Sequence, residues 1–156
     1  MLVVIASILI LIFIAFLPIF SRSGAGESQI VQMSVSHLLP EHLYERNPIV
    51  LTDRIVRAAQ VASTVFRWHY IVRRKTVCQV NKQTLNRAFF ATLHARGDQT
   101  TVVRLDKHGI PSVDVVLRKD QVLIVPMRWR YTVTQGKISA SEYHNVASLI
   151  LLMSRV

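Results

Sequence analysis

The hydrophobic and polar positions of this chain change pattern along its length, and the first pattern is an apolar run at the N-terminus. Residues 1–20 read MLVVIASILILIFIAFLPIF, where only Ser7 and Pro18 interrupt the run. A helix of about 20 residues rises about 30 Å, which matches the hydrocarbon core of a bilayer. The pattern therefore predicts a transmembrane anchor. The side chains that we expect to hold this anchor in lipid are Leu2, Ile5, Leu9, Leu11, Ile12, Phe16 and Phe20.

A cleaved signal peptide is the alternative interpretation of this segment. A signal peptide needs a basic region before its apolar stretch, and this chain has none. Residues 23–26, Ser-Gly-Ala-Gly, nevertheless resemble a cleavage site, so this alternative stays open. Residues 21–28 are small and polar and predict a flexible linker. Only Arg22 and Glu27 flank the apolar run, so the charges do not fix its orientation in the membrane.

Between residues 30 and 68 the pattern changes to short segments with helical or strand spacing. We expect a strand at 30–35, a short helix at 37–46 that Ser36 could cap, and a buried strand at 49–51. Thr52 and Asp53 are suitable caps for a further helix that extends to about residue 68. Apolar residues recur along this second helix at helical spacing, which predicts that one face packs on a core.

Strand-like segments then follow one another at roughly regular spacing. Turn residues connect them, including Arg96-Gly97-Asp98 and Gln135-Gly136-Lys137. Short strands at even spacing are typical of a sandwich or barrel, so we expect a mainly β domain with a few helices over 29–156. The expected strands lie at 70–80, 87–95, 100–105, 113–117, 121–126, 128–134 and 143–153.

One of these strands alternates strictly between apolar and polar residues. Trp129 and Tyr131 alternate with Arg128 and Arg130. Since neighbouring side chains of a strand point to opposite faces, we expect the aromatic rings to point inward and both arginines to share one outer face. This face is the first part of a predicted partner-binding surface. Its second part is the basic run of Arg73, Arg74 and Lys75.

The net charge of the chain indicates what kind of partner these basic residues could bind. The 156 residues hold 19 Lys and Arg against 9 Asp and Glu, a formal net charge of +10. None of the charged side chains lies in residues 1–21, so the domain carries the whole excess. A domain of this kind favours an anionic partner, such as lipid headgroups, an acidic protein surface or nucleic acid.

Patterns that support catalysis or cofactor binding are missing from the sequence. The six histidines do not fall at zinc-ligand spacing, the glycines do not form a phosphate-binding loop, and no nucleophile elbow occurs. The single cysteine, Cys78, sits in a strand-like segment and is interpreted as a small core residue. We therefore expect no cofactor, no metal and no enzymatic activity.

Two segments resemble cupin-like domains of the JmjC-related kind. Residues 35–55, VSHLLPEHLYERNPIVLTDRI, look like the opening of these domains, and residues 117–133, LRKDQVLIVPMRWRYTV, look like their late hairpin. Pro126 and Trp129 match this hairpin as they stand. The resemblance implies a jelly-roll barrel. It also implies a missing metal site, because Tyr131 replaces the ligand histidine and the early His-x-Asp pair has no counterpart.

A narrower resemblance includes the apolar N-terminus. Together with the segments NPIVLTDRI, VLIVPMRWRYTV and EYHNVASLILL, it is similar to small membrane-anchored, cupin-like proteins of large DNA viruses. This resemblance implies a single-pass minor capsid protein that lies in the inner membrane of the virion, beneath the shell, and contacts other capsid proteins.

Two alternatives from other classes stay open. A membrane-bound cupin-type oxygenase would need two histidines and a carboxylate around iron. A nucleic-acid-binding membrane protein would use the basic residues on the phosphate backbone.

Overall fold

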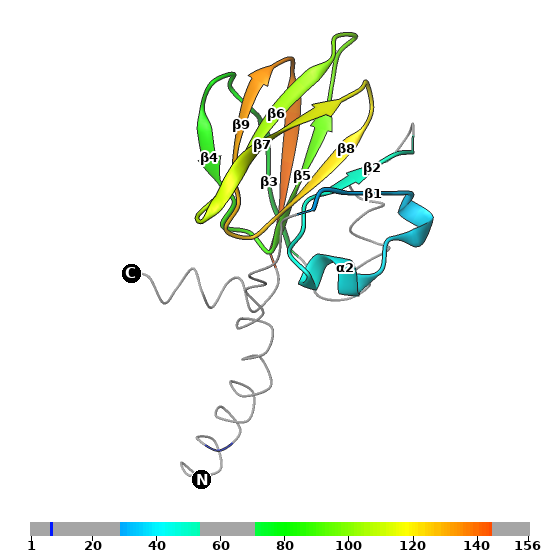
Figure 1. Ribbon diagram of the computed structural model, residues 1–156, viewed down its shortest axis with the longest axis vertical. Coiled ribbons are helices and arrows are strands. Elements are labelled where there is room, and N and C mark those ends of the chain that lie inside the picture. The colour runs from blue at the N-terminus through cyan, green and yellow to red at the C-terminus, as the bar shows by residue number, and fades with distance from the viewer. Residues whose placement is uncertain (1–6, 8–28, 54–70, 145–156) are drawn as a thin grey trace.

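Two facing β-sheets form the part of the chain that the computed structural model describes, which is residues 29–53 and 71–144 together with Ser7 (Figure 1). One sheet has six strands in the order β1-β2-β8-β5-β10-β3, and the other has four in the order β4-β9-β6-β7. This confirms the prediction of a mainly β domain. The strands are β1 (Val31–Met33), β2 (Ile49–Leu51), β3 (Ile71–Val77), β4 (Gln83–Leu85), β5 (Phe90–Ala95), β6 (Thr101–Lys107), β7 (Ile110–Leu117), β8 (Val122–Pro126), β9 (Arg130–Gln135) and β10 (Ile138–His144).

The chain passes repeatedly between the two sheets. From β3 onward it alternates sheets at every step except one, since β6 and β7 form a hairpin within the four-stranded sheet. All strand pairs are antiparallel apart from β1 and β2, which run parallel. Consecutive turns therefore lie at opposite ends of the sheets, so the two ends of the domain carry different loops.

The expected helix at 37–46 is replaced by two shorter elements, η1 (Val35–His37) and α2 (Pro40–Tyr44). Leu38 and Leu39 between them are extended, and Pro40 is the first residue of α2. A proline disfavours helical geometry in the residue before it, which explains why one continuous helix does not form. The cap of the first element is Ser34 rather than Ser36.

Asp53 also has a role that the sequence did not indicate. Its carboxylate accepts hydrogen bonds from the Val35 backbone N–H at 2.5 Å and from the Ser34 hydroxyl at 3.0 Å. These two bonds lower the pKa of the Asp53 carboxyl, and the Val35 bond has the larger effect. Asp53 thus fastens the start of η1. The helix predicted from Asp53 to residue 68 lies almost wholly outside the described residues.

Two strand predictions are corrected, and one strand was not predicted. The last strand was expected at 143–153, but β10 begins at Ile138, so the polar Ser-Ala-Ser-Glu stretch belongs to it. β4 was not predicted, because its three residues are mostly exposed. The alternating strand expected at 128–134 begins only at Arg130, since residues 127–129 form the connection from β8.

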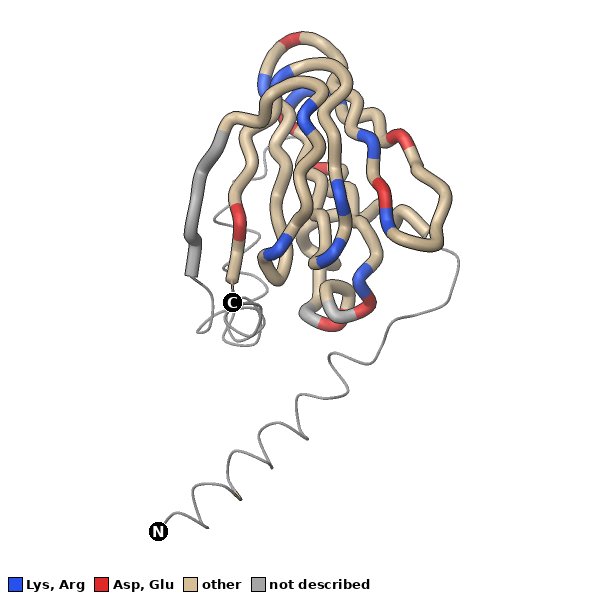
Figure 2. The backbone as a smooth tube through the Cα atoms, turned by 90° about the vertical axis from the view of Figure 1, so that its left-hand side faces the viewer, with Lys and Arg blue, Asp and Glu red and all other residues tan. Residues whose placement is uncertain are grey.

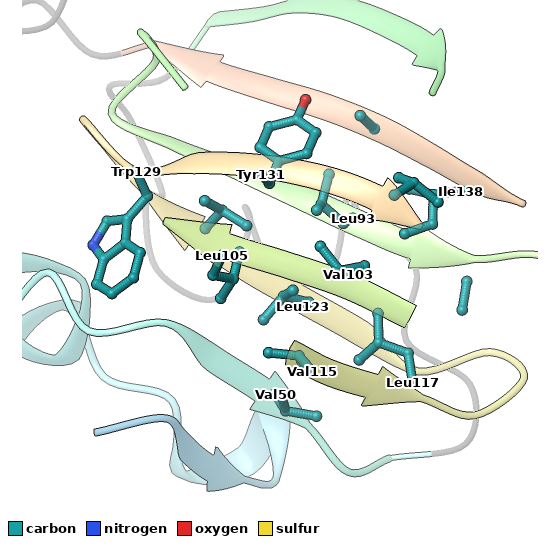
Figure 3. Packing of buried hydrophobic residues seen from close by; sticks show 14 residues of the cluster. Val50, Leu93, Val103, Leu105, Val115, Leu117, Leu123, Trp129, Tyr131 and Ile138 are labelled. Atoms are coloured by element: carbon teal, nitrogen blue, oxygen red, sulfur yellow. The ribbon is translucent and has the colours of Figure 1, made fainter. Parts of the chain in front are cut away.

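Two hydrophobic clusters lie on opposite faces of the six-stranded sheet. The first fills the space between the sheets and includes Leu93, Leu105 and Leu123 (Figure 3). In the second, side chains of η1, α2 and the segment between them pack on the outer face of that sheet. β8 contributes Leu123 to the first cluster and Ile124 to the second, so it is buried on both faces. This explains its continuous apolar run.

The predicted anchor lies outside the described residues, apart from Ser7, and so do the side chains assigned to hold it in lipid. Within the described part of the chain, no helix has the length and apolar character that crossing a bilayer requires.

Candidate functional site

The two arginines of the predicted outer face lie on different backbone elements. Arg130 is the first residue of β9, whereas Arg128 lies in the preceding turn with a left-handed φ of +70°. Both side chains are exposed, but they do not share one face of one strand as predicted. The prediction for the aromatic rings is confirmed, since Trp129 and Tyr131 are 1% and 3% exposed.

Asn86 explains why the strand starts late, because it holds residues 126–129 in a turn. The Asn86 N–H donates to the Trp129 carbonyl at 2.8 Å, and the Arg128 N–H donates to the Asn86 carbonyl at 2.9 Å. The buried Asn86 amide also donates to the Val125 carbonyl at 2.8 Å and accepts from the Ala88 N–H at 3.0 Å. A buried side chain satisfied in this way rigidifies the turn that presents Arg128.

Three basic residues lie next to Trp129, two of them from distant parts of the chain. Its indole N–H donates a hydrogen bond to the Arg46 carbonyl at 3.0 Å. The Lys107 ammonium lies over the indole ring, 5.5 Å from its centroid, in a cation–π contact. Arg128 directly precedes Trp129. We call Arg46, Lys107 and Arg128 the basic cluster.

The three cations of the basic cluster influence one another. Partial burial lowers the pKa of Arg46, and the charge of Arg128 lowers it further. Partial burial and the charge of Arg46 likewise lower the pKa of Lys107. Among the described residues, neither Lys107 nor Arg128 forms an ion pair. Arg46 thus lies close enough to Arg128 and to Lys107 for their charges to interact.

Two other exposed cations, Arg104 and Lys119, form ion pairs with carboxylates. Arg104 makes a two-pronged ion pair with Asp114, at 2.8 and 3.0 Å. Lys119 pairs with Asp98 at 2.5 Å. Exposed pairs of this kind contribute little to stability, but they neutralise part of the surface charge. Figure 2 shows Lys and Arg positions at both ends of the strands, including the lower end, at the height of α2. The basic cluster lies where β6 ends and β9 begins.

The second part of the predicted surface is not joined to the first. Arg73, Arg74 and Lys75 lie in β3, the edge strand of the six-stranded sheet, where Arg74 is opposite Glu142 of β10. Arg130 lies in the four-stranded sheet between Leu85 of β4 and Asp106 of β6. The structure thus divides the predicted basic face between two sheets.

The space between the sheets is occupied near the position that the cupin resemblance assigns to a metal. The Tyr131 phenol, in β9, lies near the Cys78 thiol and the Thr84 hydroxyl. Burial raises the pKa of the Tyr131 phenol, and the nearby Cys78 and Glu142 raise it further. Burial also raises the pKa of the Cys78 thiol, which is half-buried against the core as predicted. Both groups are therefore kept protonated at neutral pH.

Possible metal ligands are scattered through the domain. Within residues 29–53 and 71–144, no three His, Cys, Asp or Glu side chains converge as the ligands of an ion would. The described groups best placed to contact a charged partner are those of the basic cluster.

Sequence reasoning missed two of the three residues of this cluster. Arg46 was placed at the end of the helix expected at 37–46, and Lys107 was given no role. The only signal was Trp129 itself, because a buried indole requires an acceptor for its N–H and its ring face attracts cations. Nothing in the sequence says which carbonyl or which lysine fills these roles.

Comparisons with family models, with curated proteins and with solved structures yield no match to this chain. The fold and the basic cluster are therefore the features from which a function can be inferred.

Proposed function

We propose that this protein is a structural virion component, a minor capsid protein that links an inner viral membrane to the capsid shell. The observation that carries the proposal is the basic cluster, a group of basic residues next to Trp129 on a domain that follows a predicted membrane anchor. Cations grouped in this way suit docking on an anionic surface rather than bond-breaking chemistry.

The arrangement of strands supports a jelly roll, the architecture that the resemblance implies. Strands β3 to β10 number eight, and they form the two four-stranded groups β8-β5-β10-β3 and β4-β9-β6-β7. Eight strands divided between two facing sheets, with most connections crossing between them, are typical of jelly rolls. A jelly roll by itself does not indicate an activity, so the function has to be inferred from the residues of the site.

The occupied interior argues for docking over an oxygenase. The oxygenase alternative needs an imidazole at the position of Tyr131. A protonated phenol that is buried in the core beside Cys78 and Thr84 is a poor substitute. Nucleic-acid binding is the weaker alternative, because Arg73–Lys75 lie in β3, the edge strand farthest from β8 among the strands β8-β5-β10-β3, whereas the basic cluster lies in the loop after α2, at the end of β6 and in the turn after β8. These residues do not follow one strand as a single track for a phosphate backbone.

The two ends of the domain suggest how the link is made. The first strand begins at Val31, whose N–H donates to the Pro48 carbonyl at 3.0 Å, two residues from Arg46. The expected linker therefore joins the domain beside the basic cluster. The turns at 96–100, 118–121 and 135–137 lie at the opposite end of the strands and are free to contact the shell.

Alkaline carbonate extraction of purified particles, followed by N-terminal sequencing, tests this function. We expect the chain in the membrane pellet with residues 1–20 retained. A soluble chain that begins near Gly26 would contradict the anchor, and absence of the chain from the particles would contradict the virion assignment.

A further inference from the structure

The turns at the end of the strands farthest from Trp129 form one continuous rim. Strands β8, β5, β10 and β3 lie side by side, and each begins or ends there. The Arg96 N–H donates to the Lys137 carbonyl at 2.8 Å, and the Cys78 N–H donates to the Ile138 carbonyl at 3.0 Å. Neighbouring strands lie about 4.8 Å apart, so these four strand ends extend over about 14 Å. We call them, with the turns at 96–100, 118–121 and 135–137, the turn rim.

Two of these turns are packed tightly together. Gly136 has a φ of +91°, and a Cβ added there would collide with both the side chain and the main chain of Thr101. Thr101 is the first residue of β6 and directly follows the turn that begins at Arg96. The turn that carries Lys137 therefore lies against the end of the turn that carries Arg96, and the turn rim has a defined shape before any partner binds.

Positive charge is in excess on the turn rim. Its turns contain two carboxylates, Asp98 and Asp120, and four exposed cations, which are Arg96, Arg118, Lys119 and Lys137. Lys119 pairs with Asp98 at 2.5 Å, and the Asp120 carboxylate lies 4.0 Å from the imidazole of His94. In the part of the chain that the structure describes, the other three cations form no ion pair. They are available to an anionic partner.

Exposed apolar side chains continue the turn rim beyond Lys137. Val77, the last residue of β3, is 78% exposed, and Val80, which forms a bridge with Val133, is 50% exposed. Val77 lies opposite Ser139, two residues after Lys137. An apolar area bordered by charged groups is the usual arrangement of a protein–protein interface. The composition of the turn rim therefore fits a protein partner.

We infer that the turn rim, with Arg96, Arg118, Lys137, Val77 and Val80 exposed on it, is a docking surface for an acidic, extended segment of another protein. An extended segment of about four residues is about 14 Å long and would follow the strand ends. Its carboxylates would lie beside the cations, and an apolar side chain at one end would cover the valines. This inference deepens the proposed function and rests on it for the source of the segment, which would be a shell protein.

Other macromolecules fit the turn rim less well. A second copy of this chain would bring an equally positive rim against the first, and the two would repel. A nucleic acid would leave Val77 and Val80 uncovered, and its phosphates would approach the Asp98 carboxylate, whose side chain is 89% exposed.

The test measures binding of labelled probes to the full chain in an uncharged detergent by fluorescence anisotropy. The probes are an eight-residue peptide of alternating Glu and Leu, its Gln–Leu analogue, an eight-residue Glu peptide and an oligothymidylate of the same length. The charge variant is Arg96→Gln with Lys137→Gln. Its matched control is Arg87→Gln with Arg130→Gln, which removes the same charge from exposed arginines at the opposite end of the strands. The apolar variant is Val77→Ser, and its control is Val116→Ser, an exposed valine of β7.

We expect the Glu–Leu peptide to bind the wild-type chain, and to bind more weakly as salt rises. Its affinity should fall by about fivefold or more in the charge variant, by about threefold in Val77→Ser, and by less than about twofold in both controls. Equal losses in a variant and its control, no loss in either variant, or no binding by the wild type would overturn the surface. Oligothymidylate, Gln–Leu or Glu peptides that bind as tightly as the Glu–Leu peptide would overturn the assigned partner, and so would wild-type dimers that the charge variant abolishes.

All variants are first compared with the wild type by thermal unfolding. If the charge variant unfolds, Arg96→Gln alone replaces it, with Arg87→Gln as its control, and the same criteria apply. A chain that sediments with particle membranes but shows no binding through the turn rim would reject this inference and leave the proposed function standing. A soluble, cleaved chain would reject the function itself.

Discussion

The indole N–H of Trp129 donates a hydrogen bond to the main-chain carbonyl of Arg46, a residue 83 positions earlier, at a distance of 3.0 Å. This bond joins the loop after α2 to the turn between β8 and β9. It explains why a tryptophan, and not another large apolar residue, occupies this position. It also brings the main chain at Arg46 next to the turn that carries Arg128.

Trp129→Ala should destabilise the domain strongly. Truncation of a fully buried aromatic ring leaves a cavity and should cost about 3–5 kcal/mol. The Arg46 carbonyl would also lose its donor. Val116→Ala is the control, because this side chain is largely exposed and its removal should cost about 0.5 kcal/mol or less. Urea denaturation of both variants measures the difference, and similar midpoints would show that Trp129 is not the core residue described here.

Glycine substitutions should separate the two neighbouring arginines. Arg128→Gly should raise the free energy of unfolding by about 0.5–1 kcal/mol, because glycine adopts the left-handed φ without strain. Arg130→Gly, in β9, should lower it by about 1 kcal/mol, because glycine weakens a strand. Denaturant midpoints of the two variants are the measurement. Destabilisation by Arg128→Gly as large as that by Arg130→Gly would argue against the strained turn.

Stability should fall at alkaline pH because of Tyr131. Its pKa is raised in the folded protein, while the unfolded phenol titrates near 10.0. Above that pH the unfolded state loses protons that the folded state retains, so the stabilisation present below it is lost as pH rises. Thermal unfolding between about pH 9 and 12 should show this decline for the wild type and a shallower one for Tyr131→Phe. Identical slopes would contradict the buried phenol.

Asn86→Ala should act on the turn rather than on the core. The change leaves the Val125 carbonyl and the Ala88 N–H without their side-chain partners, which should cost about 1–3 kcal/mol. Lys82→Ala is the control, since Lys82 is exposed in a different connection and is not among the residues with a left-handed φ. Hydrogen exchange should show faster exchange of the Arg128 N–H in Asn86→Ala alone. Unchanged exchange of that proton would mean that Asn86 does not hold the turn.

Strands with a continuous or alternating apolar pattern could be predicted from sequence, and those without one could not. β2 and β8 are buried on both faces, so their apolar runs were found to within a residue. β4 has no such pattern because most of it is exposed at a sheet edge, and the polar start of β10 was overlooked for a similar reason.

Only part of the candidate site could be predicted from the sequence, and the reason is physical. The burial of Trp129 and Tyr131 follows from local alternation, which sequence records directly. The turn at Arg128 depends on Asn86, and the cluster depends on Arg46 and Lys107, none of them a neighbour in sequence. Such contacts arise from tertiary packing and leave no local pattern.

Cross-linking mass spectrometry of intact particles tests the central claim, that the domain bridges a membrane and a shell by its opposite ends. Lys119 and Lys137 are exposed in turns at the end of the strands far from the basic cluster, whereas Lys107 belongs to the cluster. We predict cross-links from Lys119 and Lys137 to a shell protein and none from Lys107. Cross-links to the shell from Lys107 alone, or none from any of these lysines, would contradict the account.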